Sequence, residues 1–292
     1  MTCYNEFSGL DGLARELGIT TTPFAPRRCA VEVHGRIISA VQWGAKPEII
    51  FLHGGGQNAH TWDATVLAVA RPALAIDLPG HGHSSWRGNG YDPGALADDV
   101  ARALDALVSG PLPVTGMSLG GLVGIELAAA GRVTALALVD ITPAVTQERA
   151  APVLQTVMEA ASKATEDDLL DFLSTAMPQR SRASLQRSLG HNIVRGKDGW
   201  RWRYDPDIMS AAAGFDASPL WQLLRQANCP TLLVRGGRSK AVLEADIDRL
   251  RSHLPRAEVA VIDGAGHSIQ SDAPIELAAQ LRSFLGLPSP TG

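Results

Sequence analysis

The 292-residue sequence has little cysteine, no long apolar run and no dense block of basic residues. Its three cysteines, Cys3, Cys29 and Cys229, are scattered without CxxC spacing, which argues against a disulfide framework or a bound metal such as structural zinc. The net charge is −4, and without a basic cluster we expect no nucleic-acid partner. No stretch approaches the roughly 18 apolar residues of a membrane span, so no membrane partner is expected either.

The N-terminus also lacks a charged segment followed by an apolar one, which is the pattern of a secretory signal. We therefore expect a soluble, cytoplasmic protein. Hydrophobic residues make up 45% of the chain, which is enough for one large core with a smaller inserted unit. The sequence leaves the oligomeric state open.

Short apolar segments typical of strands alternate with amphipathic segments typical of helices. This alternation predicts an α/β protein whose mostly parallel sheet is covered by helices on both faces. Strands are predicted within residues 31–43 (two strands joined through Gly35), 48–52, 73–76, 112–115, 133–139, 231–235 and 259–262. Helices are predicted at 60–70, 92–108, 119–130, 243–253 and 274–285.

Strand signals stop between residues 142 and 228, here called the inserted segment, and the pattern there is helical. Thr165 and Asp168 resemble a capping box before one of its helices. We therefore predict a helical lid. The predicted division is an N-terminal extension (1–27), a first core part (28–141), the lid (142–228), a second core part (229–287) and a flexible tail rich in Pro, Ser and Gly (288–292).

Gly116-Met117-Ser118-Leu119-Gly120 is a GxSxG match between a predicted strand and a predicted helix. A sharp strand-to-helix turn strains its central residue and needs residues without side chains two positions before and after it. This context predicts Ser118 as a nucleophile rather than a serine that only caps a turn. The N–H of Leu119, at the start of the helix, is then one donor of an oxyanion hole.

His267 follows the last predicted strand and precedes the last helix, where an imidazole can reach over the edge of the sheet to a serine. It is therefore the predicted general base. His81 and His83 are its competitors, and we interpret them as residues that stabilise a loop. The glycines after His53 lie at the end of a strand, and they predict Gly55, or alternatively Gly56, as the second oxyanion donor.

Four motifs together resemble the α/β-hydrolase superfamily: LHGGG at 52–56, DLPGHGHS at 77–84, GMSLGG at 116–121 and GAGHS at 264–268. The match spans roughly residues 31–285, and it is most similar to lid-bearing esterases and carbon-carbon bond hydrolases. This resemblance implies an eight-stranded, mostly parallel sheet and a lid inserted after the sixth strand. It also implies that no cofactor is needed and that the order of catalytic residues is serine, acid, histidine.

The sequence departs from the family pattern at the acid. Arg238, Ser239 and Lys240 stand in the loop where the resemblance implies an aspartate. Without a carboxylate, the histidine loses its preferred tautomer and the stabilisation of its charged form. Asp140, at the end of an earlier strand, is the predicted replacement, although it could instead stabilise a turn. Glu244 is the second candidate.

These residues predict a serine hydrolase that cleaves a small carboxylic ester through an acyl-enzyme. The predicted pocket aromatics are Trp62, Trp86, Phe172 and Trp202, although such residues are often ordinary packing. The inserted segment is rich in basic residues, of which one or two are candidates for binding a substrate carboxylate; a solvated surface is the simpler interpretation. These residues are Arg180, Arg182, Arg187, Arg195, Lys197, Arg201 and Arg203.

Two other functions stay open at this point. The same triad serves hydrolysis of a carbon-carbon bond in a keto acid, and also lyase or perhydrolase reactions. A ligand-binding receptor or signalling protein that keeps the fold is the alternative of another class, and the missing acid after the seventh strand is the feature that favours it.

Overall fold

The computed structural model describes residues 5–20, 24–197 and 199–288. In this part of the chain, eight strands form one sheet in the order β1-β2-β4-β3-β5-β6-β9-β10. β2 runs antiparallel to both neighbours, and the remaining pairs are parallel, as predicted. The strands are β1 (Pro26–Val33), β2 (Arg36–Trp43), β3 (Ile49–Leu52), β4 (Ala73–Ile76), β5 (Leu112–Met117), β6 (Val133–Val139), β9 (Thr231–Gly236) and β10 (Glu258–Ile262).

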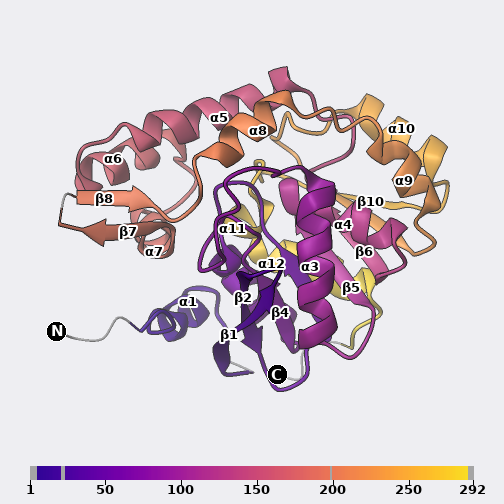
Figure 1. Ribbon diagram of the computed structural model, residues 1–292, viewed down its shortest axis with the longest axis horizontal. Coiled ribbons are helices and arrows are strands. Elements are labelled where there is room, and N and C mark those ends of the chain that lie inside the picture. The colour runs from indigo at the N-terminus through magenta and orange to yellow at the C-terminus, as the bar shows by residue number, and fades with distance from the viewer. Residues whose placement is uncertain (1–4, 21–23, 198, 289–292) are drawn as a thin grey trace.

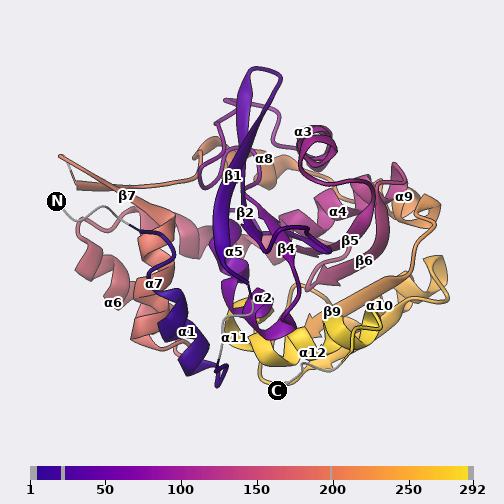
Figure 2. The ribbon, with the colours of Figure 1, turned by 90° about the horizontal axis from the view of Figure 1, so that it is seen from below.

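Helices cover both faces of the sheet (Figure 2). One face packs against α3 (Pro93–Leu107), α4 (Leu119–Ala129) and α9 (Leu220–Gln226). The other packs against α1 (Leu10–Glu16), α2 (Asp63–Val69) and α12 (Pro274–Phe284). Because both faces are buried, the central strands are apolar throughout rather than alternating. The core therefore consists of two apolar layers on either side of one sheet.

The core has further helices in the connections that follow its strands. A short 3-10 helix, η1 (Ala59–Trp62), precedes α2. α10 (Glu244–His253) connects β9 to β10, and α11 (Ile269–Asp272) lies between β10 and α12. These connections begin after the carboxyl ends of parallel strands, which is where sheets of this kind place their sites.

The inserted segment between β6 and β9 arches over the rest of the molecule (Figure 1). Its helices are α5 (Gln147–Ala161), α6 (Glu166–Ala176), α7 (Arg182–Asn192), α8 (Asp207–Gly214) and, at its end, α9, which packs against the sheet. α6 begins with the predicted capping box of Thr165 and Asp168. A small apolar core of its own joins α6 and α7 through residues such as Leu169 and Leu185.

The inserted segment also contains strands that the sequence analysis did not predict. β7 (Ile193–Gly196) and β8 (Gly199–Trp202) form an antiparallel hairpin. Each strand has four residues, which is too short for a clear alternation of apolar and polar positions. Packing of Ile193 and Trp202 against the small apolar core stabilises them instead.

Parts of the predicted extension and tail lie outside the described residues. These are residues 1–4, with Cys3, residues 21–23, and residues 289–292. Within the predicted extension, α1 buries Leu10, Leu13 and Ala14 in the layer that also contains α2. No helix among the described residues has the length and apolar character needed to cross a bilayer.

Candidate active site

Ser118 lies on the turn between β5 and α4 with a φ of 50° and a ψ of −119°. This left-handed conformation is unfavourable for a residue with a side chain, so the surrounding packing must maintain it. A Cβ on Gly116 would lie 2.3 Å from the carbonyl oxygen of Gly120, and one on Gly120 would lie 2.3 Å from that of Leu52. The two glycines therefore permit the tight turn that presents Ser118.

Asp140 and His267 meet although 127 residues separate them in sequence. His267 Nδ1 lies 2.7 Å from Asp140 Oδ2, and the Asp140 side chain is fully buried. Asp140 directly follows β6, whereas His267 lies in the loop between β10 and α11. Because Nδ1 is engaged by the carboxylate, Nε2 is the nitrogen left to face a substrate. His267 and Ser118 line the same two cavities.

Two further donors hold the Asp140 carboxylate. The Gly236 N–H donates to Oδ1 at 3.0 Å, and the Ser239 hydroxyl donates to Oδ2. Ser239 lies in the loop after β9, where the family resemblance implied an acid. In the sequence, Ser239 is only one of the residues that stand where the resemblance implies an aspartate. One signal would have identified this pair: a hydroxyl residue in the loop after β9 and an acid at the end of β6, the neighbouring strand.

The other acid candidate, Glu244, has a different environment. Its side chain is 77% exposed and forms an ion pair with Arg235. The structure therefore brings Asp140, and not Glu244, into contact with the histidine.

The predicted oxyanion donors are the backbone N–H groups of Leu119 and of Gly55 or Gly56. Leu119 is the first residue of α4, so its N–H has no acceptor within the helix. Gly55 lines both cavities with Ser118. The neighbouring Gly56 N–H instead donates to His81 Nε2 at 3.1 Å. This bond favours Gly55 over Gly56 as the second donor.

His53 and His81 connect the loop of glycines at 54–56 to the loop at 77–84. His53 Nδ1 contacts the Gly54 carbonyl at 2.7 Å, and its Nε2 accepts from the Leu78 N–H at 2.9 Å. Burial lowers the pKa of His53 to about 4 and that of His81 to about 3, so both rings are neutral acceptors at neutral pH. His81 thus has a structural role in the loop.

Two cavities meet at Ser118 and His267. The first, here called the apolar cavity, has a volume of about 150 Å³ and is lined largely by apolar side chains such as Leu122, Ile141 and Phe215. The second, here called the polar cavity, has a volume of about 180 Å³ and is lined by more polar groups. Among these are Gln57, Thr61, Arg180, Ser188, Asn192 and Ser271. The nucleophile therefore stands between two chemically different compartments.

Of the four predicted pocket aromatics, Trp202 lines the polar cavity. The structure does not bring the other three to either cavity. Trp62 is fully buried against Phe51 in the core, Trp86 is 45% exposed beneath Arg201, and Phe172 lies beneath Lys163. The prediction for Trp62 and Trp86 followed from nearness in sequence to site loops, and that for Phe172 from its place in the inserted segment.

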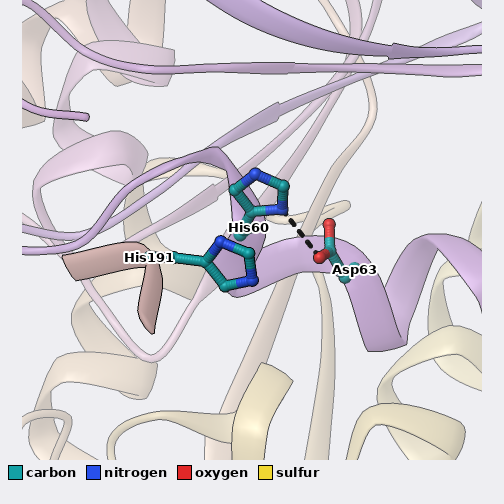
Figure 3. Close-up of side chains that lie close together, drawn as sticks. All are labelled: His60, Asp63 and His191. Atoms are coloured by element: carbon teal, nitrogen blue, oxygen red, sulfur yellow. Dashed lines mark hydrogen bonds and ion pairs between the residues drawn. The ribbon is translucent and has the colours of Figure 1, made fainter. Parts of the chain in front are cut away.

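A separate cluster of residues with metal-ligand side chains brings His60, Asp63 and His191 together (Figure 3). Their donor atoms lie within 4.8 Å of one another. His60 contacts Asp63 at 2.8 Å through Nδ1 and Glu6 at 3.1 Å through Nε2. Burial alone would lower the pKa of His60, but the Asp63 and Glu6 carboxylates outweigh it and raise the pKa to about 9. The His60 imidazole and the two carboxylates thus form a hydrogen-bond junction.

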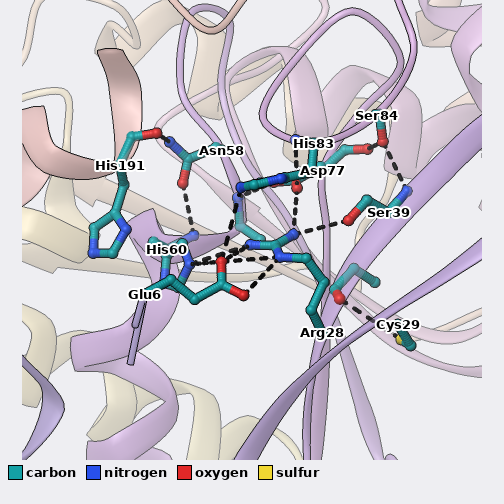
Figure 4. Close-up of polar contacts among 12 residues, drawn as sticks. Glu6, Arg28, Cys29, Ser39, Asn58, His60, Asp77, His83, Ser84 and His191 are labelled. Atoms are coloured by element: carbon teal, nitrogen blue, oxygen red, sulfur yellow. Dashed lines mark hydrogen bonds and ion pairs between the residues drawn. The ribbon is translucent and has the colours of Figure 1, made fainter. Parts of the chain in front are cut away.

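The junction extends to the loop at 77–84 through Arg28 (Figure 4). Arg28 donates to Glu6 at 2.6 Å and to Asp77 at 2.7 Å. Asp77 also accepts the backbone N–H groups of Ala59 and His83. Burial raises the pKa of Asp77, but Arg28 and these donors outweigh it, and the net pKa is lowered. Asp77 thus has the turn-stabilising character expected of a buried, fully paired carboxylate.

These features define a hydrolase built on a doubly covered parallel sheet with a serine on its nucleophile turn. The model of the alpha/beta hydrolase family matches residues 49–280, and the chain belongs to that family. Esterase Rv0045c of Mycobacterium tuberculosis is 39% identical over 98% of this chain and 97% of its own length. A solved structure of that esterase superposes with a TM-score of 0.85 over 98% of this chain and 100% of that chain.

More distant relatives have other substrates in their names. A 2-(acetamidomethylene)succinate hydrolase of Mesorhizobium japonicum is 28% identical over 91% of this chain and 97% of its own length. A solved structure of an E-2-(acetamidomethylene)succinate hydrolase, 23% identical, has a TM-score of 0.81 over 90% of this chain and all of that chain, which supports the fold alone. The family is therefore shared, while substrates within it differ.

Proposed function

We propose that this hydrolase is a serine carboxylesterase with a Ser118-His267-Asp140 triad. The observation that carries the proposal is the 2.7 Å contact between His267 Nδ1 and the buried Asp140 carboxylate, next to cavities that His267 shares with the strained Ser118. Similarity over nearly the whole chain to an esterase supports the same reaction class.

In the proposed mechanism, Ser118 Oγ attacks the ester carbonyl while His267 Nε2 accepts the hydroxyl proton. Asp140 stabilises the resulting imidazolium, and the Leu119 and Gly55 N–H groups stabilise the oxyanion. The imidazolium then protonates the leaving alkoxide, and an alcohol departs from the acyl-enzyme. A water molecule, deprotonated by His267, attacks the acyl carbon, and the acid product leaves with Ser118 restored.

We further propose that the inserted segment is a lid. Residues of α5 and α7 line the polar cavity, so movement of these helices would alter access to Ser118. Closing such a segment over the substrate excludes water and strengthens the electrostatic contacts inside.

A fluorophosphonate probe tests the proposal directly. We expect prompt labelling of the wild type, no labelling of Ser118→Ala, and slow labelling of His267→Ala. Hydrolysis of 4-nitrophenyl butyrate should follow the same order. Complete absence of labelling and turnover in the folded wild type would instead favour the binding protein of the same fold, and turnover confined to vinylogous diketones would favour carbon-carbon bond hydrolysis.

A further inference from the structure

Arg180 is a partly buried cation on the wall of the candidate site. It lies just before α7 and lines the polar cavity together with Ser118 and His267. Its Nη2 donates to Ser184, at 3.3 Å to the carbonyl oxygen and 3.1 Å to the hydroxyl. Its Nε is buried without a hydrogen-bond partner. A buried guanidinium remains charged, and leaving one of its donors unsatisfied costs stability.

Four other arginines in and near the inserted segment have a carboxylate partner. These ion pairs are Arg149–Asp246, Arg182–Asp171, Arg187–Glu16 and Arg195–Glu166. Arg36 and Arg235 also have a buried Nε without a partner, but each forms an ion pair, with Asp99 and Glu244. Among the described residues, Arg180 combines an unsatisfied Nε with no carboxylate within ion-pair distance.

The opposing charge of Asp272 does not neutralise Arg180. Asp272 attracts it, but the Asp272 carboxylate accepts the Gly266 N–H at 2.8 Å and the Gln179 amide at 3.4 Å. Burial is the main cause of a lowered pKa for Arg180, and the charge of Arg187 adds to it. The lining of the polar cavity contains no aspartate or glutamate among the described residues, and Arg180 is its one lysine or arginine. This cavity is therefore suited to a negatively charged group.

We propose that Arg180 binds a carboxylate of the substrate in the polar cavity, so that the enzyme prefers esters carrying a free carboxylate. This inference rests on the proposed esterase function. A carboxylate satisfies the planar donor edge of a guanidinium with two parallel hydrogen bonds. The uncharged portion of the same ester then occupies the apolar cavity on the other side of Ser118.

The test compares matched esters. In the first pair, 4-nitrophenyl hydrogen glutarate carries a carboxylate on the acyl side and 4-nitrophenyl valerate does not. In the second pair, 4-carboxyphenyl butyrate carries a carboxylate on the alcohol side and 4-methylphenyl butyrate does not. The measured quantity is the ratio of kcat/KM for the charged ester to that for the neutral one, in the wild type, Arg180→Gln, Arg180→Lys and the control Arg182→Gln.

We expect Arg180→Gln to lower this ratio about 10- to 100-fold for at least one pair, mainly through a higher KM for the charged ester. Arg180→Lys should retain part of the preference, since it keeps the charge but loses the fork of donors. Arg182→Gln should retain the wild-type ratio, because Arg182 is exposed and paired with Asp171.

A ratio unchanged within twofold in both pairs would overturn the role of Arg180. If Arg180→Gln does not fold, inhibition of the wild type replaces it: glutarate should inhibit hydrolysis of the neutral ester competitively and more strongly than glutaramide, and equal inhibition would overturn the proposal. Turnover of the neutral ester in the wild type and its loss in Ser118→Ala test the proposed function separately, because that function fails if the wild type has no turnover or if turnover persists in this variant.

Discussion

The Ser239 hydroxyl donates a hydrogen bond to the buried carboxylate of Asp140. Ser239 comes from the loop after β9 and Asp140 from the end of the adjacent strand β6. The loop that usually supplies the acid in this family thus supplies a donor instead. Neighbouring strands present their carboxyl ends at the same edge of the sheet, so either loop can reach the same histidine. This geometry supports the proposed assignment of Asp140, at the end of the earlier strand, as the acid of the triad.

Replacing Asp140 tests the assignment of the acid. Asp140→Asn should lower kcat for 4-nitrophenyl butyrate by roughly 10⁴-fold, because an amide does not stabilise the charged imidazole and favours the wrong tautomer. The control is Glu244→Gln, which removes an exposed carboxylate paired with Arg235 and should keep kcat within about twofold. The opposite ranking of these two variants would make Glu244 the acid.

Removing the Ser239 hydroxyl should have a smaller effect. In Ser239→Ala, Asp140 keeps its contacts with Gly236 and His267, so we expect kcat to fall roughly 3- to 10-fold with KM little changed. Ser239→Thr retains a hydroxyl and should recover most of the loss. Equal kcat values for the alanine, threonine and wild-type proteins would show that this hydrogen bond does not support catalysis.

The nucleophile turn should tolerate no side chain at Gly120. A Cβ there would meet the backbone at Leu52 and His53, so Gly120→Ala should destabilise the fold by several kcal/mol or abolish turnover. Gly190, inside α7, has open space around its Cβ position. Gly190→Ala should therefore raise the free energy of unfolding by about 0.5–1 kcal/mol. Chemical denaturation of both variants measures this contrast, and similar values for the two would contradict it.

Acid should destabilise the protein through its buried neutral histidines. Burial, together with the neighbouring charge of His60, lowers the pKa of His191 to about 3. The unfolded chain, with a histidine pKa near 6.5, takes up this proton first, so the stabilisation is present above about pH 6.5 and is lost as pH falls toward 3. Between pH 6 and 4, His191→Gln should reduce the slope of unfolding free energy against pH by about 1.4 kcal/mol per unit. Parallel slopes would exclude this role.

For His60 we expect the opposite dependence, a loss of unfolding free energy as the pH becomes alkaline. Its pKa of about 9 lies above the unfolded value, so its stabilisation is present below about pH 6.5 and is lost as pH rises through 9. The wild type should lose on the order of 2–3 kcal/mol of unfolding free energy from this group across that range. His60→Gln should show a flatter profile between pH 7 and 9, measured by urea denaturation. An equally steep profile in the variant would assign the loss to other groups.

Much of the fold could be predicted from local sequence patterns. Apolar strands buried on both faces and amphipathic helices have different periods, so their alternation predicted the parallel sheet and its two helical layers. The β7–β8 hairpin was missed because strands of four residues carry too little pattern and depend on contacts with Ile193 and Trp202. Trp202 lines the polar cavity, whereas Trp62 and Trp86 are near the site in sequence but their side chains lie in the core and at the surface.

The sequence by itself determined the turn that bears Ser118, because glycines at 116 and 120 are a local steric requirement of its backbone. It also determined the order of strands and helices, which follows from hydrophobic period. Only the tertiary structure decided that the Asp140 carboxylate contacts His267 and that Ser239 supports it. Likewise, only the folded chain shows that Arg180, with a buried Nε that has no partner, lines the same cavity as Ser118. Contacts between residues distant in sequence depend on how strands and loops assemble, and no local sequence pattern specifies which of these residues meet.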